Sequence, residues 1–167
     1  MKNSKNKGNH YERVISKKLS LWISNGIRDD LLWRTHNSGG RFTHRFNIGK
    51  DTINQSGDIT STSSLSEYFS NKYIIECKSY NDINLWTLFT NKNINNSVLS
   101  WWKNNKKKAD IINKTLLLIV KQDFKPDLLF TSVEFKIDPI AVFFYKSDKI
   151  IVYNLDFLLS KQYIDLI

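Results

Sequence analysis

The sequence has one cysteine and no long apolar segment, and both features exclude classes of protein. Among its 167 residues Cys77 is the single cysteine, so neither an internal disulfide framework nor a cysteine-rich zinc site can form. This use of cysteine is typical of a reducing compartment, and we expect a cytoplasmic protein. No apolar run approaches the roughly 20 residues of a membrane span, and the polar N-terminus has no signal-peptide core.

Acidic residues are also scarce, and their distribution along the chain is uneven. The formal net charge is +9. Residues 1–125 carry 21 Lys and Arg against 10 Asp and Glu, whereas residues 126–167 carry 4 against 6. A basic surface with Trp and Tyr among its lysines indicates a polyanionic partner such as nucleic acid. The richness in Lys, Asn and Ile would also follow from an AT-rich genome.

Hydrophobic periodicity predicts an α/β fold in which helices flank a mixed β-sheet. We expect residues 1–8 to form a flexible basic arm and residues 9–167 to form a single domain. Helices are predicted at about 11–24 and 97–113, the second with Ser97 as N-cap, and a short helix is predicted after Asn154. Strands are predicted at 31–35, 56–60, 72–79, 115–120, 140–145 and 149–153, the last two joined by a Ser147-Asp148 turn.

An acidic residue interrupts the apolar stripe of the first predicted helix. Tyr11, Ile15 and Leu19 share one face of that helix, and Glu12 falls within the same stripe. One interpretation is a capping box, because Asn9 and Glu12 have the spacing of the N-cap and N3 positions. The other is a carboxylate directed from the helix towards a metal site.

The segment Tyr73-Ile74-Ile75-Glu76-Cys77-Lys78-Ser79-Tyr80 starts as an apolar strand and then places Glu76 and Lys78 on one face. Alone, this pair could be a structural ion pair. Asp58, which follows Gly57 on the preceding predicted strand, would lie near Glu76 if the two strands pair antiparallel. Two carboxylates and a backbone carbonyl such as that of Cys77 are hard oxygen ligands suited to Mg²⁺.

That combination predicts hydrolysis of a nucleic-acid backbone. A cation held by Asp58 and Glu76 could orient a water and stabilise the charge that develops at phosphorus. Lys78 could orient or help deprotonate that water, or stabilise the phosphate. Glu12 could hold a metal-bound water or assist a second ion.

A polar, glycine-punctuated loop and the second long helix supply further cations. We predict contacts to nucleic acid from two groups of residues. The first belongs to the loop and its entrance, and the second to the exposed face of the helix at 97–113. They are Arg34, His36, Ser38, Arg41 and Arg45 in the first group, and Lys103 and Lys107 in the second. Each of them could equally be a solvated side chain.

Asp58 and Glu76-Cys77-Lys78, preceded by a helix bearing Glu12 and followed by a basic helix, resemble the PD-(D/E)xK nuclease superfamily. The segment Arg34 to Gly40 resembles the archaeal-type Holliday junction resolvases and their phage-encoded relatives. The resemblance implies a restriction-endonuclease-like fold, a homodimer, and Mg²⁺-dependent cleavage of DNA, with branched DNA among the candidate substrates and Mn²⁺ as a substitute metal. By this resemblance Asp58, Glu76 and the Cys77 position bind metal, Lys78 is the catalytic lysine, and Glu12 is the helix acid.

The sequence departs from that pattern in several places. Gly57 stands where the motif has proline, and Asp58 and Glu76 are 18 positions apart, so the serine-rich segment between them is an elaboration. Segments 41–55 and 81–96 have no evident counterpart. Three alternatives therefore stay open: a restriction-like or repair nuclease, an RNA-directed nuclease, and a non-catalytic DNA-binding module of the same fold.

Overall fold

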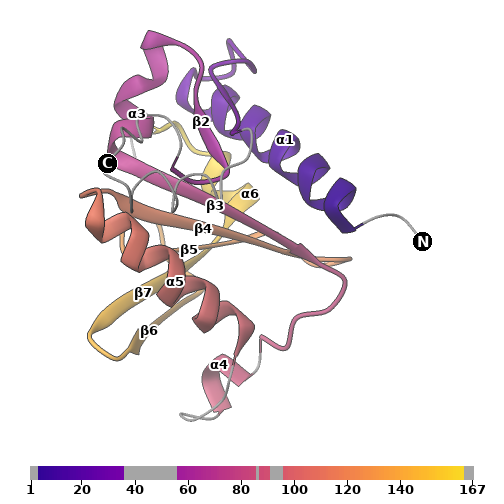
Figure 1. Ribbon diagram of the computed structural model, residues 1–167, viewed down its shortest axis with the longest axis vertical. Helices are drawn as coiled ribbons and strands as arrows, with labels where there is room; N and C mark the ends of the chain where they lie inside the picture. The colour runs from indigo at the N-terminus through magenta and orange to yellow at the C-terminus, as the bar shows by residue number, and fades with distance from the viewer. Residues whose placement is uncertain (1–3, 36–55, 86, 91–95, 164–167) are drawn as a thin grey trace, which may run out of the picture.

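A seven-stranded mixed sheet forms the centre of the computed structural model, which describes residues 4–35, 56–85, 87–90 and 96–163 (Figure 1). The strand order is β1-β2-β3-β4-β5-β7-β6. β3 and β4 pair in parallel, and the other neighbouring strands pair antiparallel. The strands are β1 (Leu32–Arg34), β2 (Ile59–Ser61), β3 (Tyr73–Tyr80), β4 (Thr115–Gln122), β5 (Leu128–Thr131), β6 (Ala141–Tyr145) and β7 (Asp148–Asn154).

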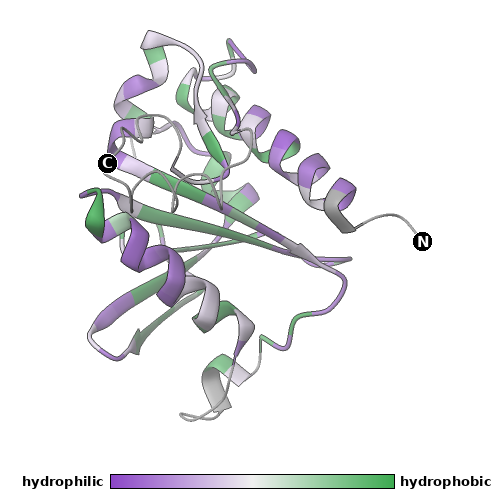
Figure 2. Ribbon diagram, viewed as in Figure 1, coloured by the Kyte–Doolittle hydropathy of each residue, from purple (hydrophilic) through white to green (hydrophobic). Residues whose placement is uncertain are grey.

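Helices cover both faces of this sheet, which confirms the predicted α/β architecture. They are α1 (Ser4–Ile23), α3 (Glu67–Lys72), α4 (Thr87–Thr90), α5 (Ser97–Ile111) and α6 (Leu155–Leu159), with a 3₁₀ turn, η1, at Ser64–Ser66. Side chains of α1 and α6 share one buried cluster with one face of the sheet, and side chains of α5 share a second cluster with the other face. Figure 2 shows apolar residues along β3 and β4 and hydrophilic residues along α5. In the described ranges no helix is long and apolar enough to cross a membrane.

Helix α1 begins earlier than the sequence predicts. It starts at Ser4, so residues 4–8, expected to belong to an arm, are helical. Asn9 is therefore inside the helix, and the capping box of Asn9 with Glu12 is wrong. The predicted end is confirmed: Gly26 has a φ of +84° and its N–H donates to the Leu21 carbonyl at 2.7 Å.

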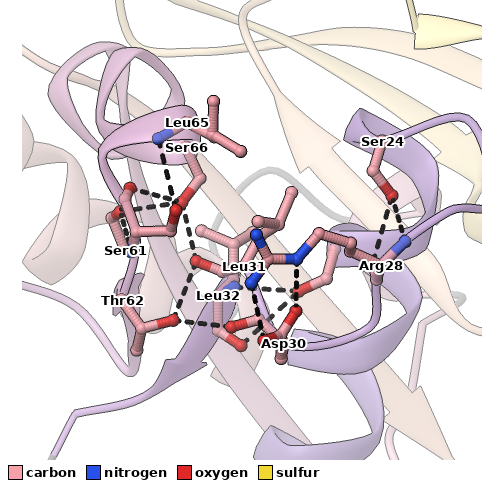
Figure 3. A network of polar contacts seen from close by, with 11 residues as sticks. Ser24, Arg28, Asp30, Leu31, Leu32, Ser61, Thr62, Leu65 and Ser66 are labelled. Atoms are coloured by element: carbon pink, nitrogen blue, oxygen red, sulfur yellow. Dashed lines mark hydrogen bonds and ion pairs between the residues drawn. The ribbon is translucent and has the colours of Figure 1, made fainter.

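The serine-rich segment between β2 and β3 holds the outer strand in place (Figure 3). Ser66 Oγ donates to the Leu31 carbonyl at 2.7 Å, and Thr62 Oγ1 donates to the Asp30 carbonyl at 2.6 Å. Ser61 and Ser66 share a hydroxyl hydrogen bond of 2.7 Å. Hydroxyl groups thus satisfy backbone carbonyls beside the three-residue strand β1, which explains why this segment contains so many serines.

Other elements also differ from the prediction. The strand predicted at 56–60 is β2 at Ile59–Ser61, and helices α3 and α4 were not predicted. Asn96, and not Ser97, caps α5, because the Asn96 side chain accepts from the Val98 and Leu99 N–H groups. The turn before β7 lies one residue earlier than expected, with Lys146 at a φ of +56°. Strand β5 was not predicted, since its four residues are too few to show a period.

Candidate active site

Asp58 is fixed at the start of β2 by three hydrogen bonds. Its N–H donates to the Ile75 carbonyl at 2.7 Å, and its own carbonyl accepts from the Thr35 N–H at 2.8 Å. Its Oδ2 accepts from the Cys77 N–H at 2.8 Å. β2 and β3 pair antiparallel, as predicted. Ile59 lies opposite Ile75, so Asp58 lies against the middle of β3.

Gly57 explains the departure from the motif's proline. Its φ of +80° is one that proline, held near −65°, cannot adopt. A Cβ at this position would lie 2.6 Å from the Ile75 carbonyl oxygen, the atom that accepts the Asp58 N–H. The glycine therefore permits the close approach of the two backbones that positions Asp58.

The variant Gly57→Ala is expected to destabilise the fold by more than the roughly 1–2 kcal/mol of a left-handed backbone alone, because the contact with Ile75 adds to it. Gly26→Ala is the matched control, since Gly26 also has a positive φ but would have no atom within 4 Å of a Cβ. Chemical denaturation of both variants measures the difference. An equal loss of unfolding free energy in the two variants would contradict the role given to the close approach.

Glu76 and Lys78 lie side by side on β3 and form an ion pair. Lys78 Nζ donates to Glu76 Oε1 at 2.5 Å, and the two side chains are only 23% and 11% exposed. Ile74 belongs to the buried cluster under α5, and side chains alternate along a strand, so Glu76 and Lys78 face α5. The predicted shared face is confirmed.

Burial and the charges around them raise the pKa values of both Glu76 and Lys78. Burial, and then the nearby Asp58 carboxylate, raise the pKa of Glu76, against the opposing effects of Lys78 and Lys108. Burial of the Lys78 ammonium favours its neutral form, but the Glu76 and Asp58 carboxylates outweigh this and leave the pKa of Lys78 above its ordinary value. The site thus holds two close acids and one charged lysine, an arrangement that attracts a further cation.

Glu12 reaches this region from α1, on the opposite face of the sheet from α5. Its Oε2 accepts from Arg34 Nε at 3.0 Å, and Arg34 Nη2 donates to Asn9 Oδ1 at 2.7 Å. Burial and the Asp58 carboxylate raise the pKa of Glu12 despite the guanidinium. Arg34, predicted to contact nucleic acid, therefore holds the helix acid in this structure.

Helix α5 contributes a cation that the sequence analysis missed. Lys108 acts electrostatically on Glu76, and its Nζ donates to Asn105 Oδ1 at 3.2 Å. The predicted contacts Lys103 and Lys107 are exposed on the same helix. The position of Lys108 next to the buried residue Ala109 is the feature of the sequence from which its role could have been predicted.

The predicted contacts His36, Ser38, Arg41 and Arg45 lie outside the described residues.

The donor set fits a hard divalent cation. In a strand the N–H and C=O of one residue point to the same side, so the Cys77 carbonyl faces β2, as its N–H does. The Cys77 thiol is not a suitable ligand, because burial and the Asp58 carboxylate raise its pKa well above the ordinary value. Asp58, Glu76 and the Cys77 carbonyl would then supply oxygen ligands. In the part of the chain that the structure describes, no three His, Cys, Asp or Glu side chains form a ready metal cluster.

Comparison with known proteins identifies the family. A family model described as phage putative PDDEXK endonuclease matches residues 3–165. No curated protein and no solved structure matches the chain. The family match confirms the predicted PD-(D/E)xK superfamily, and the mixed sheet with flanking helices is consistent with its restriction-endonuclease-like fold. The chain therefore belongs to the phage PDDEXK endonuclease family.

Proposed function

We propose that this protein is a Mg²⁺-dependent endodeoxyribonuclease that hydrolyses phosphodiester bonds. The observation that carries the proposal is the meeting of Asp58 from the start of β2 with Glu76 and Lys78 from β3, joined by the bond from the Cys77 N–H to Asp58. The family match supports the same chemistry. A bound Mg²⁺ would polarise a phosphoryl oxygen and lower the pKa of a coordinated water, and Mn²⁺ would substitute for it.

The protein's own groups have distinct tasks in this proposal. Asp58 and Glu76 hold the cation, and the backbone bonds of Asp58 keep its carboxylate in place without a cost of reorganisation. Lys78 is charged and paired with Glu76, and it would be free to contact the phosphate or the attacking water if a cation bound Glu76 in its place. Glu12, which Arg34 orients, adds a third acidic side chain from the α1 side of the sheet.

We further propose a preference for branched DNA and action as a homodimer. The resemblance of the Arg34 to Gly40 segment to Holliday junction resolvases supports this preference. Two active sites related by a two-fold axis match a junction, which presents two equivalent strands.

A substrate panel tests both parts of the proposal. A four-way junction, a linear duplex, a single strand and a matched RNA, all of equal length, are incubated with the protein and Mg²⁺. We expect cleavage of DNA, with the junction cut fastest. Equal rates on junction and duplex would reject the resolvase-like preference, cleavage of RNA alone would indicate an RNA-directed nuclease, and binding without cleavage would favour the non-catalytic module.

Metal affinity is expected to depend on pH through Glu76. Its pKa lies above the ordinary 4.5, so the folded, metal-free protein binds more protons than the unfolded chain between these two values. The unfolding free energy of the metal-free protein therefore falls as pH rises through that interval. A cation must displace the same proton, so Mn²⁺ affinity should weaken as pH falls through it.

Calorimetric titration with Mn²⁺ at about pH 7.5 and about pH 5.5 measures this dependence. The variant Glu76→Gln, which has no titrating group at this position, should bind weakly and show a flatter dependence. An affinity of the natural protein that is the same at both pH values would contradict the role given to Glu76.

A further inference from the structure

Tyr80 extends the row of side chains that contains the active-site lysine. It is the last residue of β3 and lies two positions after Lys78, on the same face of the strand. The Cα atoms of such residues are about 7 Å apart. The Tyr80 phenol contributes to the raised pKa of Lys78, so the two side chains are within electrostatic range.

Trp101 of α5 orders the Tyr80 ring. The two rings are stacked, with centroids 4.9 Å apart and an interplanar angle of 21°. Trp101 is partly buried and packs against the cluster under α5, whereas Tyr80 is 46% exposed although one face of its ring is covered. The pair therefore presents an ordered aromatic surface to solvent immediately beside Lys78.

The turn at this end of the sheet supports the same surface. The Asp123 N–H donates to the Tyr80 carbonyl at 3.1 Å, which ties the end of β3 to the turn after β4. Lys7 Nζ bonds Asn81 Oδ1 at 2.5 Å and both Asp123 carboxylate oxygens at 2.8 Å. Lys7 thus neutralises a carboxylate that would otherwise repel a phosphate backbone. Phe124 in the same turn is fully exposed.

We propose that Tyr80, backed by Trp101, is a stacking platform for an unpaired nucleobase next to the phosphate that is cut. The inference rests on the proposed nuclease function and narrows its substrate class to DNA in which a base is unpaired at the cleavage point, either in a single strand or where the bound protein opens a branch point. Bases inside a duplex are already stacked on their neighbours, so a base that leaves the stack gains most from an exposed ring. Stacking of a base on an aromatic side chain is worth about 1–3 kcal/mol, or roughly 5- to 150-fold in affinity.

Binding measurements separate this platform from a merely structural pair. Fluorescence anisotropy with Ca²⁺ in place of Mg²⁺, with gels to verify uncut DNA, gives the Kd of a single strand and of a duplex with the same sequence. Tyr80→Ala should weaken binding of the single strand by about tenfold and leave duplex binding within about twofold. Tyr80→Phe, which keeps the ring, should bind both like the natural protein. Equal losses on single strand and duplex, or no loss on either, would overturn the proposal.

Abasic substitutions locate the base that stacks. One position of the single strand should weaken binding to the natural protein when its base is removed, and the same removal should have no further effect on Tyr80→Ala. Additive losses at every position would overturn the proposal.

Two further measurements decide the outcome if the variant is misfolded or the protein is inactive. If Tyr80→Ala changes the near-ultraviolet circular dichroism, the natural protein is instead photocross-linked to DNA that carries 5-iodouracil at the identified position. A cross-link to Tyr80 supports the platform, and a cross-link to another residue rejects it. A parallel reaction with Mg²⁺ shows whether the natural protein cuts DNA. Cleavage together with unchanged binding by Tyr80→Ala rejects the platform alone, whereas no cleavage of any DNA rejects the proposed nuclease function.

Discussion

Asp58→Asn is expected to reduce DNA cleavage by about 10²–10³-fold or more, because the variant loses one of two carboxylates that hold the cation. The amide retains an oxygen that accepts the Cys77 N–H, the bond that Asp58 Oδ2 now makes at 2.8 Å. The substitution also removes the charge that raises the pKa of Glu76. The unfolding free energy of the metal-free variant should therefore equal or exceed that of the natural protein.

Asp127→Asn is the matched control for this variant. Asp127 is also a buried acid, at 4% exposure against 8% for Asp58. It pairs instead with Lys121 at 3.3 Å and Lys18 at 3.9 Å. The Asp127→Asn variant should be less stable than the natural protein, and its cleavage rate should stay within about twofold of the natural rate. Initial rates on a labelled DNA substrate measure cleavage, and denaturant titrations measure stability. A fully active Asp58→Asn variant would contradict the assignment of Asp58 to the active site.

Lys78→Met is expected to lower both the rate of DNA cleavage and the stability of the fold. Cleavage should fall by about 10²-fold or more through loss of the ammonium beside the phosphate. Stability should fall as well, since Glu76 would remain buried without its partner at 2.5 Å. Removing one member of a buried pair costs roughly 3–5 kcal/mol, and the partial exposure of Lys78 places the expected loss near the lower limit.

The double variant Glu76→Gln with Lys78→Met separates these two effects. It removes the unpaired charge, so it should recover most of the stability that Lys78→Met loses but none of its activity. Denaturation and cleavage assays on the four proteins of this cycle measure the coupling. Recovery of cleavage in the double variant, or a stability loss equal to that of Lys78→Met, would contradict the assigned roles.

The part of the site that lies on β3 was predictable because strand periodicity is local. An apolar run followed by Glu76 and Lys78 two positions apart fixes a shared face whatever surrounds the strand. The antiparallel neighbour and Asp58 followed from two successive predicted strands, the first of them entered through a glycine. Helix α5 was predictable for the same reason, since its buried stripe of Val98, Trp102 and Ala109 repeats at helical spacing.

Contacts between distant segments were not predictable from local patterns. The Arg34 guanidinium pairs with Glu12, because α1 and β1 lie side by side, and no local pattern predicts that pair. Residues 4–8 were predicted to belong to an arm, yet they extend α1, with Lys7 bound to Asp123, 116 positions away. Lys108 was not among the predicted contacts, because its effect on Glu76 depends on how α5 packs against β3.

Anomalous diffraction from a crystal soaked in Mn²⁺ tests the metal site most directly. We predict one strong peak within about 2.0–2.6 Å of carboxylate oxygens of both Asp58 and Glu76 and of the Cys77 carbonyl oxygen, and no peak there in Asp58→Asn. The ammonium of Lys78 should have moved away from Glu76 in that crystal. Saturating Mn²⁺ that leaves no peak between Asp58 and Glu76, with the Lys78 to Glu76 bond intact, would contradict the proposed metal-dependent nuclease.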